Sequence, residues 1–155
     1  MNRKILAILA LLIVVAGAGV VSAFSFGDLT GSSSDAETVT IDGIDFNIPA
    51  GFEEEEKLAL DGVENETSGV KYTTWGKTYS NDKNEVISIG VATYDGVEVD
   101  DSVAQYVGGD ELSINGVDGY DYTYPPFDGF AYAKDGKLVI ISVSDGEILK
   151  DIVVK

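Results

Sequence analysis

An uncharged, apolar run near the N-terminus constrains this chain more than any other feature. It extends over the 22 residues from Ile5 to Phe26 and contains no Asp, Glu, Lys or Arg. A helix of that length would measure about 33 Å, and the hydrocarbon core of a bilayer is about 30 Å thick. A soluble helix of this length would carry a polar face. The run therefore predicts a transmembrane or signal helix.

The charges on either side of this run predict its orientation. Arg3 and Lys4 precede it, whereas Asp28, Asp35 and Glu37 follow it. Because positively charged flanks stay in the cytoplasm, we expect the rest of the chain to lie outside. The expected localisation is the cell membrane, with a single span and an external C-terminal domain.

The sequence is consistent with two outcomes for this helix, which are cleavage by a signal peptidase and retention as a membrane anchor. Val21-Ser22-Ala23 offers small residues for a signal peptidase, and cleavage near Ala23 would release a secreted domain. The apolar character continues through Phe24 and Phe26, which favours a retained anchor. The sequence has no Cys, so a lipid-modified cysteine is excluded.

The composition divides the chain into three segments. We expect a signal anchor or signal peptide at 1–27, a Gly- and Ser-rich flexible linker at 28–37, and a globular domain at 38–155. All 27 acidic residues follow Phe26, as do 8 of the 10 basic ones, so the exported part carries 8 − 27 = −19. Such a surface repels phosphate backbones and excludes nucleic acid as a partner.

The absence of two residue types removes much catalytic and metal chemistry. Without Cys and His, thiol nucleophiles, Ser-His-Asp triads and the usual zinc sites cannot form within the chain. We expect no catalytic residue, no metal site and no cofactor. The enzymatic alternative is an exported hydrolase with a carboxylate pair, such as Asp121 and Asp128, as acid and base.

Alternation of apolar and polar residues predicts antiparallel strands. A hairpin with its turn at 42–43 would place Ile41 opposite Ile44 and Val39 opposite Phe46. One face of this hairpin would therefore be apolar.

Further along the chain, residues 70–80 and 85–94 are expected to pair and to bury one side. Residues 62–69 have the composition of a loop, and Glu53–Glu56 is expected to form a solvated edge or short helix. The run 137–144 is the most hydrophobic of the expected strands and is expected at the centre of the sheet.

Two helices are expected in the domain. Ser102 and Gln105 fit a capping box that begins a helix of about two turns, with an apolar face of Val103, Tyr106 and Val107. Asp145 can cap a C-terminal helix that buries Ile148, Leu149, Ile152 and Val153.

Asp-Gly pairs are frequent in the domain. We expect them in turns and caps, because Asp tolerates these conformations and Gly accepts positive φ. The pairs begin at Asp42, Asp61, Asp95, Asp118, Asp128, Asp135 and Asp145. No stretch matches the aspartate series of a calcium-binding loop.

An aromatic segment is the candidate recognition surface. Tyr120, Tyr122 and Tyr124 would line one face of a strand, and Phe127 follows a stiff Pro-Pro corner. These four residues are the predicted partner surface, since flat amphipathic rings beside carboxylates suit an unknown protein or glycan ligand. The alternative interpretation is cross-strand packing.

A possible modification site lies elsewhere in the chain. Asn65-Glu66-Thr67 is an N-glycosylation acceptor pattern, which makes Asn65 a candidate carrier of a glycan.

The order of elements resembles the Mog1/PsbP-type α+β domains. The segments that carry the resemblance are FNIPAGF at 46–52, INGVDGYDY at 114–122 and AYAKDGKLVIISV at 131–143. The resemblance covers 38–155 in outline and implies an antiparallel sheet flanked by helices, with an accessory or binding role. It carries over no functional residue.

The expected fold class is α+β. We expect an antiparallel sheet with a short mid-chain helix and a C-terminal helix packed on it, behind one N-terminal transmembrane or signal helix. The expected function is that of a membrane-anchored extracytoplasmic binding or accessory domain of the cell envelope, without catalysis.

Overall fold

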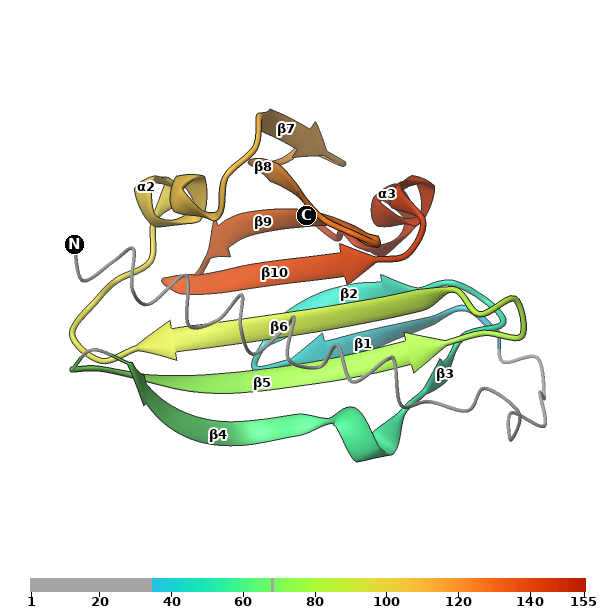
Figure 1. The fold of residues 1–155 in the computed structure, drawn as a ribbon, viewed down its shortest axis with the longest axis horizontal. Helices are drawn as coiled ribbons and strands as arrows, with labels where there is room; N and C mark the ends of the chain where they lie inside the picture. Colours follow the sequence, from blue (N-terminus) through green and yellow to red (C-terminus); the bar gives the residue numbers. More distant parts are fainter. Residues whose placement is uncertain (1–34, 68) are drawn as a thin grey trace.

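A large antiparallel sheet forms the body of the protein (Figure 1). The computed structural model describes residues 35–67 and 69–155, and the predicted membrane helix, its cleavage position near Ala23 and most of the predicted linker lie outside these residues. The strand order is β3-β5-β6-β10-β9-β8-β7, and β4 pairs with β5 beside β3. These strands are β3 (Glu53–Glu54), β4 (Leu60–Thr67), β5 (Val70–Ser80), β6 (Val86–Tyr94), β7 (Glu111–Ile114), β8 (Val117–Tyr124), β9 (Phe127–Lys134) and β10 (Lys137–Val143).

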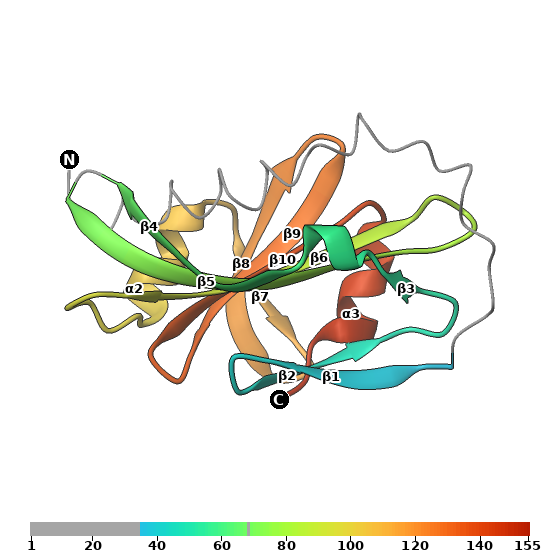
Figure 2. The same cartoon turned by 90° about the horizontal axis from the view of Figure 1, so that it is seen from below.

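A separate hairpin packs on this sheet. Its strands are β1 (Glu37–Ile41) and β2 (Ile44–Ile48), with Ile41 opposite Ile44 and Val39 opposite Phe46. This register confirms the predicted one. Figure 2 shows β1, β2 and the C-terminal helix α3 on the same side of the large sheet.

The helices are short. Helix α2 (Asp101–Ala104) continues as the 3₁₀ turn η4 (Gln105–Val107), and the 3₁₀ turn η5 (Gly146–Ile148) leads into α3 (Leu149–Ile152). One more 3₁₀ turn, η3 (Glu56–Leu58), follows β3, so the glutamate run combines a strand edge with a helical turn. None of the helices within the described ranges has the length and apolar character needed to cross a bilayer. The described domain is therefore mostly β, with two short α-helices.

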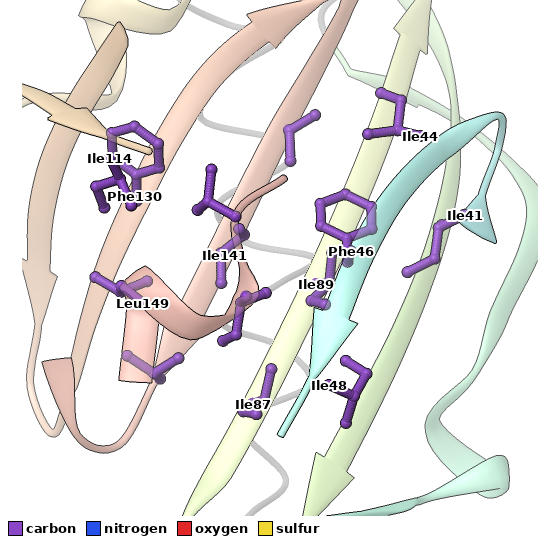
Figure 3. Close-up of a cluster of buried hydrophobic side chains, with 14 of the residues drawn as sticks. Ile41, Ile44, Phe46, Ile48, Ile87, Ile89, Ile114, Phe130, Ile141 and Leu149 are labelled. Atoms are coloured by element: carbon purple, nitrogen blue, oxygen red, sulfur yellow. The ribbon is translucent and has the colours of Figure 1, made fainter. Parts of the chain in front are cut away.

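The large sheet is buried on both faces. One face, here called the hairpin face, packs against β1, β2 and α3 (Figure 3). Its cluster includes Phe46, Ile89, Phe130, Ile141 and Ile152. The opposite face, here called the α2 face, packs against α2 through Tyr72, Tyr94, Val103, Tyr122 and Ile140.

Burial on both faces corrects the expectation that the β5–β6 pair buries one side. Val91 lies in the hairpin-face cluster, whereas the next residue, Ala92, lies in the α2-face cluster. The second face was missed because its β6 residues are mainly small or aromatic, and branched residues dominate only the other face.

The expected loop at 62–69 is also wrong, because residues up to Thr67 belong to strand β4. Pairing with β5, from Val63 opposite Thr74 to Thr67 opposite Val70, overrides the loop-like composition. The strand is irregular between Leu60 and Val63, where Gly62 has φ = +64°. Gly62 therefore marks a bulge.

Three of the expected Asp-Gly turns lie inside strands instead. Gly62 is in β4, Gly119 is in β8 and Gly129 is in β9. A Cβ atom on Gly129 would lie 2.0 Å from Cζ of Tyr122, so this glycine makes room for a ring on the neighbouring strand. Sequence alone could not reveal this requirement, because it depends on cross-strand packing.

The predicted capping box at Ser102 lies two residues after the observed N-cap, which is Asp100. The helix starts at Asp101, and the Ser102 hydroxyl donates a hydrogen bond to Asp100 Oδ1 at 2.5 Å. Val103 is buried, but Tyr106 is 47% exposed and does not belong to the buried face. At the C-terminus the prediction is confirmed, since Leu149, Ile152 and Val153 are buried and Ile148 packs beside them.

Candidate functional site

The three predicted surface tyrosines lie on the same face of β8, but their environments differ. Their spacing of two places them all on the α2 face. Tyr122 is buried, Tyr120 is half-buried and Tyr124 is 62% exposed. The predicted aromatic row is thus partly a core element and partly a surface.

Tyr122 is held in place by its hydroxyl group. The ring crosses over Gly129, and the hydroxyl lies 2.6 Å from Ser142 Oγ and donates to the carbonyl oxygen of Ile141 at 3.2 Å. Burial raises the pKa of the Tyr122 phenol to about 12, and the hydrogen bond with Ser142 offsets part of the rise. Tyr122 therefore links β8 to β10 and serves packing, which is the alternative that the sequence left open.

Tyr132 provides a matched contrast, because its buried hydroxyl has no hydrogen-bond partner in the described part of the chain. We expect Tyr132→Phe to raise the free energy of unfolding by about 1 kcal/mol, since it removes an unsatisfied buried polar group. Tyr122→Phe should lower it by about 1 to 2 kcal/mol, because Ser142 then loses its partner. Denaturant unfolding followed by circular dichroism measures both. Equal effects of the two substitutions would contradict this assignment of hydrogen bonds.

The turn between β8 and β9 presents the most exposed aromatic side chain of the described domain. Tyr124 and Phe127 pair across the hairpin and flank Pro125 and Pro126, which are joined by a cis peptide bond. Tyr124 and both prolines are exposed, whereas Phe127 is half-buried. We call Tyr124, Pro125, Pro126 and Phe127 the hairpin tip; Figure 2 shows this hairpin rising away from β1 and β2.

A shallow acidic hollow lies beside Tyr120. Its volume is about 410 Å³, and none of its lining residues is basic. Helix α2 contributes Asp101, and the β7–β8 hairpin contributes the rest: Glu111, Leu112, Ser113, Asp118, Gly119 and Tyr120. We call this feature the β7–β8 hollow.

Burial and the carboxylates of the hollow both contribute to a raised pKa of the Tyr120 phenol. Burial, together with the negative charges of Glu111 and Asp101, raises the pKa of Tyr120. Glu111 pairs directly with Tyr120 across the hairpin. An aromatic ring beside carboxylates is suited to a cationic side chain, which a carboxylate attracts and a ring face can cover.

Metal binding has no comparable geometric support. Among the residues that the structure describes, no three acidic side chains converge in a way that could hold a metal ion. This applies to the glutamate run at 53–56, in which Glu54 forms an ion pair with Lys77 at 2.7 Å and Glu55 accepts a hydrogen bond from Ser80 at 2.5 Å.

The two carboxylates of the hydrolase alternative have structural hydrogen bonds. Asp121 Oδ1 accepts from the Asp110 backbone N–H at 2.5 Å, and Asp128 Oδ1 accepts from the Thr123 hydroxyl at 3.3 Å. Both aspartates are exposed. Asp121 thereby fixes the segment that enters β7.

The candidate glycosylation residue lies on an edge strand. Asn65 pairs with Tyr72 of β5, and its side-chain amide donates to the Val63 carbonyl at 3.4 Å. The side chain is half-exposed. Modification of Asn65 stays a prediction.

Sequence reasoning found Tyr120 but missed the acidic residues around it. Asp101 is brought there by the packing of α2 against β8 and β9, which no local pattern reveals. Glu111 could have been found, because the Asn115-Gly116 turn sets the register that places Glu111 opposite Tyr120.

Comparisons with known proteins give no assignment. No family model, no curated protein and no solved structure matches this chain. The resemblance to Mog1/PsbP-type domains stays a prediction that these comparisons do not test.

Proposed function

We propose that this protein is a membrane-anchored, extracytoplasmic binding or accessory domain of the cell envelope, and that it is not an enzyme. The hairpin tip and the β7–β8 hollow form its contact surface. The N-terminal run at 5–26 supplies the anchor, and cleavage near Ala23 would give a secreted form of the same domain.

The observation that carries this proposal is the exposure of Tyr124. Its exposed fraction of 62% exceeds that of Tyr106 (47%), Val63 (40%) and Leu112 (39%). A strand rises about 3.3 Å per residue, so Tyr120 in the hollow lies about 13 Å from Tyr124 on the same face. An aromatic tip beside an acidic hollow offers both apolar area and charge to a partner.

The absence of catalysis is part of the proposal. Asp121 and Asp128 each hold a neighbouring backbone or hydroxyl group, which gives both a structural role. We therefore expect Asp121→Asn and Asp128→Asn to leave binding intact, whereas a hydrolase would lose turnover with its fold preserved.

Site-specific photo-crosslinking in intact cells tests the proposed surface. The full-length chain would carry a photoreactive phenylalanine analogue in place of Tyr124 or, as a control, in place of Asp135. Asp135 is exposed in the β9–β10 turn, distant along both strands from the hairpin tip. We expect a discrete adduct from position 124 and none from position 135. Identical yields from the two positions, or no adduct from either, would contradict the proposed surface.

A further inference from the structure

Strand β7 forms one edge of the large sheet and has no partner strand on its outer side within the described residues. It lies at the end of the strand order, farthest from β4 (Figure 1). In the part of the chain that the structure describes, its four residues, Glu111 to Ile114, pair with β8 alone. An open edge of this kind is a template for an added strand.

The hairpin register identifies which backbone groups are free. Asn115 and Gly116 form a two-residue turn with φ of 54° and 79°, so the flanking Ile114 and Val117 form a hydrogen-bonded pair. Hydrogen-bonded pairs alternate along an antiparallel ladder, and the bond from Asp121 N–H to the Asp110 carbonyl continues this alternation. The backbone groups of Glu111 and Ser113 therefore point away from β8.

The side chains of this edge favour one kind of occupant. Glu111 and Ser113 line the β7–β8 hollow together with Asp101 and Asp118, and no basic residue lines it. Strand alternation places the Leu112 side chain, which is 39% exposed, on the opposite face from the side chains of Glu111 and Ser113. A second copy that paired through β7 would bring two hollows lined by acidic and no basic residues close together, and their like charges would repel each other.

The opposite edge is less suited to pairing. Strand β4 has a register shift between Leu60 and Val63, and a bulge disturbs the regular ladder that an added strand needs. No such shift interrupts β7.

We propose that β7 accepts an extended basic segment of a partner protein as an antiparallel strand. Lys or Arg at alternating positions lie across from Glu111 and Ser113 and extend over the hollow, and the apolar residue between them contacts Leu112. The backbone amides of the basic residues pair with those of Glu111 and Ser113. This inference rests on the proposed function and specifies the partner.

A short synthetic peptide that alternates Lys and Val is the probe. Antiparallel pairing requires the amides of the Lys residues to face β7 and those of the Val residues to face away, because side-chain face and hydrogen-bonding side are coupled. N-methylation of two Lys residues should weaken binding by about tenfold or more, whereas N-methylation of two Val residues should change it by less than about twofold. The two methylated peptides have the same composition and charge. Fluorescence anisotropy with the full-length chain in nanodiscs of neutral lipid measures the affinities.

Variants of the protein provide the second arm. Glu111→Gln should weaken binding of the peptide by about fivefold or more and reduce the salt dependence of binding. Glu64→Gln on the opposite edge should leave the peptide affinity unchanged. Equal loss with both variants, or equal affinity for both methylated peptides, would overturn strand addition in favour of general charge attraction. Crosslinking from position 124 does not depend on this result, so failure of strand addition and failure of the proposed function are distinguishable.

Discussion

Replacing Gly129 with Ala is expected to lower the free energy of unfolding by about 3 to 5 kcal/mol. The added Cβ would lie 2.0 Å from Cζ of Tyr122, and the ring cannot move without losing its contacts to Ser142 and Ile141. A domain of this size is stable by about 5 to 15 kcal/mol, so much of its stability would be lost. Denaturant unfolding followed by circular dichroism measures the change.

The background of Tyr122→Ala supplies the control for this prediction. Without the ring, the methyl group of Gly129→Ala has space, and its effect should shrink to about 1 kcal/mol or less. A loss of the same size in both backgrounds would show that the backbone of Gly129, rather than its contact with Tyr122, requires glycine.

Phe46→Ala should destabilise the domain by about 3 to 5 kcal/mol. Phe46 is fully buried between the β1–β2 hairpin and the large sheet (Figure 3), and its backbone forms a β-bridge with Val153. Loss of the ring would leave a cavity at the contact that fixes the hairpin to the sheet. Thermal or denaturant unfolding gives the magnitude.

The neighbouring Asn47 offers a matched control for Phe46. Its side chain is exposed and accepts a hydrogen bond from Thr38 at 3.0 Å on the outer side of the hairpin. Asn47→Ala should change the free energy of unfolding by no more than about 0.5 kcal/mol. If Phe46→Ala were as mild as Asn47→Ala, the hairpin would not be part of the core.

Elements that depend on residues close together in the sequence could be predicted from the local pattern of apolar, polar and turn residues. The Asp42-Gly43 turn sets the register of β1 and β2, and alternation alone placed β5 at Val70–Ser80. The hydrophobicity of β10 correctly indicated a central strand, since it lies between β6 and β9.

Features that depend on long-range contacts could not be predicted in this way. Gly119 and Gly129 resemble turn residues, but the rings of Phe130 and Tyr122 on neighbouring strands require them. Strand β4 has a loop-like composition, and only its pairing with β5 makes it a strand. Of the candidate surface, Tyr120 and Tyr124 were predictable from spacing, whereas Asp101 joins them through the tertiary packing of α2.

Protease treatment of intact cells that produce the full-length chain tests most directly whether the acidic domain lies outside the cell. We expect the protein in the membrane fraction, with its acidic domain digested by added protease before any lysis. Mass analysis of the protected remainder should then recover a fragment that contains residues 5–26. A domain that resists the protease in intact cells and is digested only after lysis would contradict the external placement on which the proposed function depends.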